Sequence, residues 1–269
     1  MERLLVIKLD ALDSEAEVRL NGIPLARVNA ARTRATVPVH EYTMAGTNRL
    51  ELVVWPHPAA TAADPALPTL PCVADGKRAA VARILLPRIG SAIDETAARS
   101  LAQLEWAPAA GEKYDAPLTL TLDVVLPVSF PRWRWMEAPP AEATPALAAQ
   151  ALAFVQAMAQ DLAGGVTERF MTATRLRTEE LAIAYQRRPE DETQRLRDHL
   201  LALHAAARLP FLPVQAEGFV LRAVAGGRLF ECLDVAGQPA LSTAVDAQGR
   251  SLALPLRVAF VDDKLYVLR

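Results

Sequence analysis

The sequence predicts two domains, an all-β sandwich over residues 1–137 and an α+β domain over residues 146–269. Hydrophobic residues recur with a period of two through the first half, as they do in half-buried strands. The segment APPAEATP, residues 138–145, has the composition of a linker. After this segment the hydrophobic residues recur with helical spacing, and from residue 217 they again recur with a period of two. A chain of 269 residues is long for one domain and long enough for two.

Short strands separated by turns fill the first half. In AEVRLNGIPLARV, apolar and charged residues alternate over residues 16–20, and Asn21-Gly22 favours a tight turn. The stretch SAIDETAARSLAQLEW, residues 91–106, is either a short helix or a loop that enters a strand. The predicted strands are LLVIKLDAL, AEVRLNGIPLARV, TRATVPVHEY, NRLELVVW, RAAVARILLPRI and PLTLTLDVVLP. Such a series is typical of a sandwich of antiparallel sheets.

The second half is predicted to hold three helices followed by a curved antiparallel sheet. Thr144 suits the N-cap and Pro145 the first position of a helix that ends at Gly164-Gly165. The second helix is predicted over TERFMTATRLRTEELAIAYQR and the third over EDETQRLRDHLLALHAAAR. About five strands follow, over EGFVLRAVA, RLFECLD, PALSTAV, SLALPLRVAFV and KLYVLR. This order predicts an α+β domain whose sheet curls over the helices.

Composition limits the classes of function. Hydrophobic residues make up 52% of the chain and charged residues 22%, so a packed core is expected. The net charge of −2 gives no preference for nucleic acid or for an acidic membrane surface. Neither a signal peptide nor a stretch of 18 uncharged apolar residues is found in the sequence, so a cytoplasmic protein is expected.

No cofactor or metal is expected either. Cys72 and Cys232 lie far apart, and neither has a CxxC partner, so buried free thiols are favoured over a disulfide. His199 and His204 face different ways on a helix, and His40 is expected at the exposed end of a strand. The sequence holds no HExxH, GxSxG, Walker-type or GxGxxG motif.

The first half resembles a known family in one region. In AEVRLNGIPL followed by VPVHEYTMAGTNRLELVV, six residues carry the match. They are Leu20, Asn21, Gly22, Gly46, Asn48 and Leu50. The stretch resembles galactose-binding-like jelly rolls, above all the sugar-binding domains attached to some glycoside hydrolases. The resemblance implies a jelly-roll-like sandwich. In that family these positions are mostly turn and core, so no ligand-binding residue carries over.

The second half is similar in element order and size to NTF2-like domains, in which helices pack into a curved sheet. Enzymes of that family use an acidic residue or a Tyr/His pair in the pocket, whereas many members are non-catalytic. The resemblance makes Asp161 and Tyr185 the polar residues expected to border a concave sheet. The residues themselves favour a plainer interpretation, with Asp161 exposed near a helix end and Tyr185 extending an apolar face.

The segment SFPRWRWMEAPP places Trp133 and Trp135 on either side of Arg134. If the segment is extended, the two indoles project to the same side and Arg134 to the other. Two indoles on one side either stack on a sugar ring or cover a domain interface. The position immediately before the predicted linker favours the interface.

These observations favour a non-catalytic binding or interaction protein with a protein partner. A bacterial accessory role, such as a toxin-neutralising adaptor, fits this class. Carbohydrate binding through the sandwich is the alternative, and a small-molecule enzyme with an NTF2-like pocket is a weaker one. The candidate binding residues are Trp133, Arg134, Trp135, Asp161 and Tyr185. A homodimer through the C-terminal sheet is also compatible with this architecture.

Overall fold

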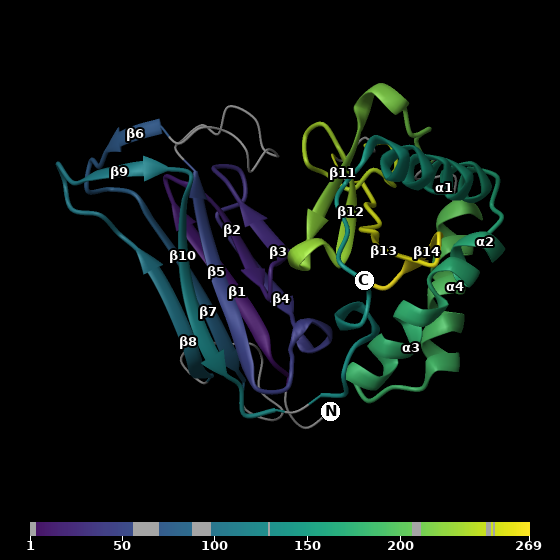
Figure 1. Cartoon of the computed structure of the whole chain (residues 1–269), viewed down its shortest axis with the longest axis horizontal. Coiled ribbons are helices and arrows are strands. Elements are labelled where there is room, and N and C mark those ends of the chain that lie inside the picture. Colours follow the sequence, from purple (N-terminus) through teal and green to yellow (C-terminus); the bar gives the residue numbers. More distant parts are fainter. Residues whose placement is uncertain are drawn as a thin grey trace. The chain divides into compact units, whose positions relative to one another are not determined.

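The computed structural model describes residues 4–55, 70–87, 98–128, 130–205, 211–245, 249 and 251–269. Contacts within the chain group it into two compact units, Met1–Arg132 and Trp133–Arg269 (Figure 1). The predicted domains and their linker over 138–145 stay predictions.

The first unit is built of antiparallel strands. Two sheets have four strands each, in the orders β4-β1-β7-β8 and β10-β5-β2-β3, and a smaller sheet pairs β6 with β9. The inner faces of the two larger sheets share one buried core. The strands are β1 (Val6–Leu12), β2 (Glu15–Leu20), β3 (Ile23–Val28), β4 (Arg34–Pro38), β5 (Thr47–Trp55), β6 (Leu70–Val73), β7 (Ala79–Leu86), β8 (Arg99–Trp106), β9 (Lys113–Ala116) and β10 (Leu118–Val125). The arrangement is compatible with the predicted β-sandwich.

The alternation that predicted these strands also positions the core. In β10, half-buried and exposed residues alternate without a break from Leu118 to Val125. The inward side chains of both larger sheets meet in one buried cluster that includes Leu9, Val18 and Leu52. Burial of this apolar surface holds the two layers together.

Three details of this unit decide between alternatives, add to the prediction or correct it. The end of the stretch 91–106 is a strand, β8, whereas residues 91–97 lie outside the described part of the chain. The short pair β6 and β9 was missed because four residues around prolines carry no clear period. The expectation of an exposed His40 was wrong, since it is buried and its Nε2 accepts a hydrogen bond from the Leu5 backbone at 2.8 Å.

The residues that carried the jelly-roll resemblance form turns and core. Asn21 adopts a positive φ of 56° in the turn between β2 and β3, and its Nδ2 donates to Asn48 Oδ1 at 2.9 Å. Asn48 is fully buried and also accepts from the Met44 backbone at 2.7 Å. The two amides therefore replace backbone hydrogen bonds that the turns leave unmade.

The second unit begins with four helices rather than the predicted three. They are α1 (Pro145–Ala163), α2 (Glu168–Ala173), α3 (Arg175–Ala184) and α4 (Pro189–Ala205). The predicted second helix is divided at Thr174, whose ψ of 3° departs from helical geometry. The buried Thr174 hydroxyl donates to the Phe170 carbonyl at 2.8 Å at this break. Thr144 caps α1 as predicted, with its side chain accepting from the Leu147 backbone.

A four-stranded antiparallel sheet follows, in the order β11-β12-β13-β14. Its strands are β11 (Phe219–Val224), β12 (Leu229–Asp234), β13 (Arg257–Val261) and β14 (Lys264–Val267). The predicted strand PALSTAV makes only isolated bridges, among them Leu233 with Pro239 and Ser242 with Ala253. Pro239 has no N–H to donate to a ladder, which interrupts pairing where this strand was expected to start.

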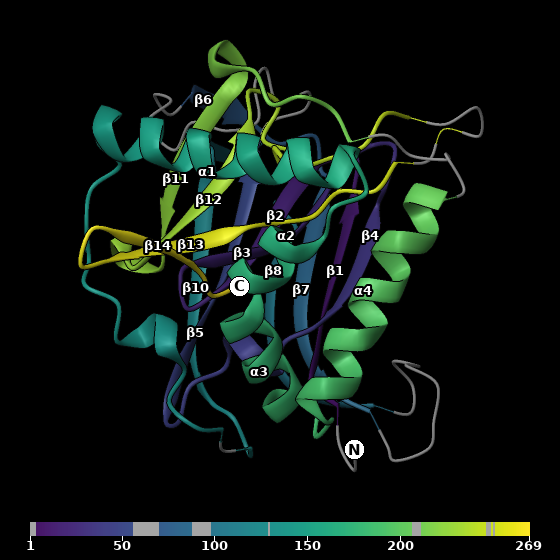
Figure 2. The same ribbon diagram turned by 90° about the vertical axis from the view of Figure 1, so that its right-hand side faces the viewer.

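The core of this unit lies between α1 and the sheet. Figure 2 shows α1 lying across β11 and β12. Val155 and Met158 of α1 pack in one buried cluster with Phe230 and Val258 of the sheet. This half therefore contains both helices and an antiparallel sheet, as predicted for a mixed architecture. Among the described residues, no helix combines the length and apolar character needed to cross a membrane.

Candidate functional site

The tryptophan segment is coiled rather than extended. Trp133 has extended backbone angles, but Arg134–Met136 form a turn of 3-10 helix, so the alternating projection expected of a strand does not apply. Trp133 is 1% exposed and Trp135 is 3% exposed. Neither indole presents an open ring face in the structure.

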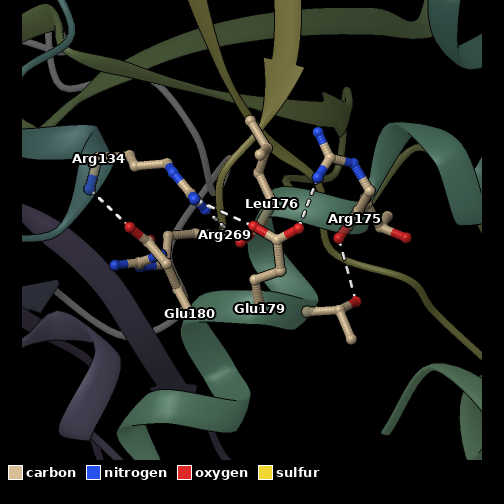
Figure 3. A network of polar contacts seen from close by, with 8 residues as sticks. Arg134, Arg175, Leu176, Glu179, Glu180 and Arg269 are labelled. Carbon is tan, nitrogen blue, oxygen red and sulfur yellow. Dashed lines mark hydrogen bonds and ion pairs between the residues drawn. The ribbon is translucent and has the colours of Figure 1, made fainter. Parts of the chain in front are cut away.

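Arg134 is fastened to α3 by three hydrogen bonds (Figure 3). Its backbone N–H donates to Glu180 Oε1 at 2.7 Å. Its guanidinium donates to Glu179 Oε2 at 3.0 Å and to the Leu176 carbonyl at 3.2 Å. Both ends of this residue are therefore held by one helix, which fixes the path of the chain between the two tryptophans.

Glu180 is the centre of this network. Its second oxygen accepts a hydrogen bond from Arg269 Nη1, and both side chains are buried. The Arg269 guanidinium also lies over the Trp133 ring, 5.3 Å from its centroid. The carboxylate is buried between two donors, and the cation is stacked on an indole. Both contacts are typical of groups with a structural role. The sequence analysis missed Glu180 and Arg269, because no local pattern distinguishes them from surface charges.

Asp161 and Tyr185 lie beside different arginines. Asp161 is partly exposed near the end of α1, and its Oδ2 accepts from Arg169 Nε at 2.5 Å. Tyr185 follows the last residue of α3, and the Arg187 guanidinium lies 5.8 Å from its ring centroid. A binding role for these two residues and for the tryptophan segment stays a prediction.

A hollow of about 410 Å³ lies in the second unit between α1 and the hairpin of β13 and β14. Gln150, Phe154, Lys264 and Tyr266 line it, and the Gln150 amide donates to the Asp263 carbonyl at 3.0 Å. Neither Asp161 nor Tyr185 is among its lining residues. The hollow is therefore a different place from the one that the NTF2-like resemblance suggested.

A larger hollow, about 450 Å³, lies on the outer face of the sheet β4-β1-β7-β8. Asp10 of β1 is at its centre and faces three cations. They are Lys8 at 3.5 Å, Arg34 of β4 at 3.2 Å and Arg83 of β7 at 3.7 Å. The strand register explains the convergence, because Arg34 pairs directly with Asp10 and Arg83 with Lys8. We call this site the Asp10 hollow.

Both charged and apolar side chains line the Asp10 hollow. Leu12, Ala79 and Val81 also line it, and the Leu12 side chain is 58% exposed. Arg83 is held in place by Gln103, whose Oε1 accepts from Arg83 Nε at 2.9 Å. The sequence analysis did not find this site. Its members are ordinary outward residues of three strands, and only the sheet brings them together.

Trp55 occupies the outer face of the other large sheet. All four tryptophans lie in the described residues, and Trp55 is the one that is not buried. The Arg27 guanidinium lies over its ring at 4.5 Å from the centroid, and Arg27 Nε donates to Glu15 Oε1 at 2.5 Å. A guanidinium stacked on an indole and paired with a carboxylate brings polar and apolar groups together at one place.

The chain matches no protein-family model, and a search of curated proteins found no match either. The likeness to galactose-binding-like jelly rolls and to NTF2-like domains therefore stays a prediction. Within the residues that the structure describes, no three His, Cys, Asp or Glu side chains are grouped as metal ligands.

Proposed function

We propose that this is a non-catalytic binding protein that engages a protein partner through the outer face of β4-β1-β7-β8. The observation that carries the proposal is the Asp10 hollow, where cations and aliphatic side chains, among them the exposed Leu12, share one concave surface. Protein interfaces combine apolar contact with charged groups that set orientation and partner choice. We propose that the protein serves as an accessory or adaptor protein in a bacterium.

Two buried carboxylates of the second unit, Glu180 and Glu231, support a binding role over catalysis. Both oxygens of Glu180 and both of Glu231 accept hydrogen bonds, and Glu231 accepts them from Arg222 and Arg257. A general acid or base must exchange a proton with its substrate through a free oxygen. These carboxylates are instead used to join strands and helices.

Site-directed photocrosslinking in the host cell tests the proposal. A benzophenone amino acid replaces Leu12 in the hollow or, as the control, Val125 on β10, which is 70% exposed on the other large sheet. The expected result is one discrete protein adduct from position 12 and none from position 125. Equal labelling at both positions, or no adduct at position 12, would count against a partner at this face.

Carbohydrate binding is a second candidate, favoured by the partly exposed Trp55 beside Arg27 and Glu15. Sugars stack on indole rings and accept hydrogen bonds from charged side chains, so binding here would change Trp55 fluorescence. A titration with a panel of neutral and acidic sugars tests this, with Trp55→Phe as the matched control. An emission change that persists in Trp55→Phe, or no change with any sugar, removes this candidate.

A further inference from the structure

We propose that the free edge of β14 binds an extended peptide segment of a partner protein. The peptide adds to the sheet β11-β12-β13-β14 as a further strand and places an apolar side chain against Phe154 and Leu265. This edge belongs to the second unit and is independent of the Asp10 hollow and of the function proposed for that hollow. Three features of the edge support peptide binding, namely unpaired backbone groups, a hollow with apolar side chains beside them and the short length of the strand.

Among the described strands, β14 lies at the edge of its sheet and pairs with β13. The Leu268 N–H, just beyond β14, donates to the Arg257 carbonyl of β13 at 3.0 Å, so these two residues form a hydrogen-bonded pair. Residue pairs of an antiparallel ladder alternate between hydrogen-bonded and non-hydrogen-bonded. Tyr266 and Lys264 therefore direct their backbone groups toward β13, whereas Leu265 directs its N–H and C=O away from the sheet.

The outward backbone groups of Leu265 are unpaired and border a hollow. Within the part of the chain that the structure describes, neither its N–H nor its C=O has a hydrogen-bond partner. Leu265 is half-buried and lines the hollow between α1 and the hairpin, whereas Val267, the next residue with outward groups, is fully buried. The backbone of an extended peptide supplies the donor and the acceptor that such an edge lacks, so a strand is the matching ligand.

The hollow lies at the edge of the sheet rather than on one of its faces. Successive strand residues point to opposite faces, yet Lys264, Leu265 and Tyr266 all line it. Phe154 of α1 also lines it, and Figure 2 shows α1 above this hairpin. Phe154 and Leu265 both pack against the buried cluster of this unit. A peptide residue paired with Leu265 has its side chain on the same face, where an apolar group extends this packing.

The dimensions of the edge favour a single peptide over a second copy of the sheet. β14 has four residues, and its end at the turn carries the exposed Lys264. Short edge strands and lysine side chains both hinder the pairing of one sheet edge with another. A short peptide enters the hollow of about 410 Å³ without bringing a second sheet against Lys264.

Fluorescence anisotropy with labelled peptides tests the proposal on the full chain. The probe is Thr-Val-Thr-Leu-Thr-Val-Thr, whose apolar side chains share one face when it is extended. A peptide residue that shares the face of Leu265 directs its N–H to β14, so methylation of the N–H groups of the apolar residues should weaken binding about tenfold. The matched control carries the methyl groups on three threonines, whose N–H groups point away from β14, and should bind as tightly as the unmethylated peptide.

Two variants at Leu265 test the protein side of the same contact. Leu265→Pro removes the outward N–H, a change that an edge strand tolerates because this N–H pairs with no strand of the sheet. Leu265→Ala also shortens the side chain but keeps the N–H. We expect Leu265→Pro to bind the unmethylated peptide about tenfold more weakly than Leu265→Ala does. Thermal unfolding shows whether each variant keeps the fold, and the methylated peptides test the contact on the unaltered chain if Leu265→Pro does not.

Equal affinities of the two methylated peptides would overturn the proposal, and so would failure of the unmethylated peptide to bind at about 1 mM. Self-association of the chain in analytical ultracentrifugation, lost in Leu265→Pro, would also overturn it and would assign the edge to a second copy. The photocrosslinking at position 12 probes a different surface, so its outcome decides only the function proposed for the Asp10 hollow.

Discussion

Glu179 and Glu180 are neighbours on α3 with different surroundings. The Glu180 side chain is 6% exposed and pairs with the fully buried Arg269, whereas Glu179 is 30% exposed and pairs with Arg134 and Arg175 at the surface. Removing one partner of a buried pair leaves an uncompensated charge inside the protein, whereas a surface pair contributes little. Substituting Glu179 and Glu180 in turn therefore compares an exposed ion pair with a buried one.

We expect Glu180→Ala to lower the free energy of unfolding by about 3–5 kcal/mol. Glu179→Ala should lower it by about 0–1 kcal/mol. Urea unfolding followed by circular dichroism measures both. Similar losses for the two variants would show that Glu180 does not hold Arg269 and the Arg134 backbone in the way the contacts indicate.

The two cysteines should differ in reactivity. The prediction of free thiols is confirmed, but burial holds for Cys232 alone, since Cys72 on β6 is half-exposed. Burial, and secondarily the charge of Glu231, raises the pKa of the Cys232 thiol to about 12. Near neutral pH, iodoacetamide should therefore modify Cys72 in the folded protein and reach Cys232 only after unfolding. Peptide mass mapping before and after denaturation distinguishes the two.

The Cys232 thiol makes the free energy of unfolding depend on pH in the alkaline range. The pKa of Cys232 is raised in the folded state from 9.0 to about 12, so the unfolded chain loses this proton first. Between these values the unfolded state binds fewer protons than the folded state, and stability falls as pH rises. The contribution is fully present below pH 9.0. Cys232→Ala should show a smaller fall in unfolding midpoint over this window than the natural chain, and an equal fall would contradict the assignment.

At the scale of elements, the turn between β11 and β12 is anchored by a backbone contact. Gly227 has a φ of +80°, and a Cβ at this position would lie 2.5 Å from the Ala141 carbonyl oxygen. The Ala141 N–H donates to the Gly227 carbonyl at 2.9 Å, and Arg228 donates to the Ala138 carbonyl. Residues of the predicted linker are thus hydrogen-bonded to this turn.

Gly226 and Gly227 form a matched pair for testing that anchor. Both have a positive φ, but a Cβ on Gly226 would meet nothing within 4 Å. Gly226→Ala should cost about 1–2 kcal/mol, the strain of an L-residue in this conformation. Gly227→Ala should cost about 1 kcal/mol more, because Ala141 must move and its hydrogen bond is broken. Equal unfolding midpoints for the two variants would argue against the contact with Ala141.

At the scale of the whole molecule, the two units have separate cores. The buried clusters share no residue, and the contacts of Arg134 with Glu180 and of Trp133 with Arg269 lie within the second unit. A fragment of residues 133–269 should therefore keep a cooperative thermal transition. A fragment of residues 146–269, the predicted domain, lacks Trp133 and Arg134 and should unfold at a lower temperature. Equal midpoints would show that the segment adds nothing to this unit.

Much of the strand content followed from local alternation. The strands over β1, β2, β5, β7 and β10 were predicted because one face of each is more deeply buried than the other, which gives the sequence a period of two. The helices over α1 and α4 followed from caps and helical spacing in the same way. The prediction failed where the backbone departs from the regular pattern, at Thr174 between α2 and α3 and at Pro239 after β12.

The sequence by itself determined the broad plan of the chain. Strand and helix periods are properties of neighbouring residues, so a β-rich half and a mixed half could be predicted without coordinates. Only the tertiary structure decided which charges meet. Asp10, Arg34 and Arg83 converge through strand pairing, and Glu180 meets Arg269 through packing. Ion pairs and hollows depend on distances in space between residues far apart in the chain, and no local pattern encodes those distances.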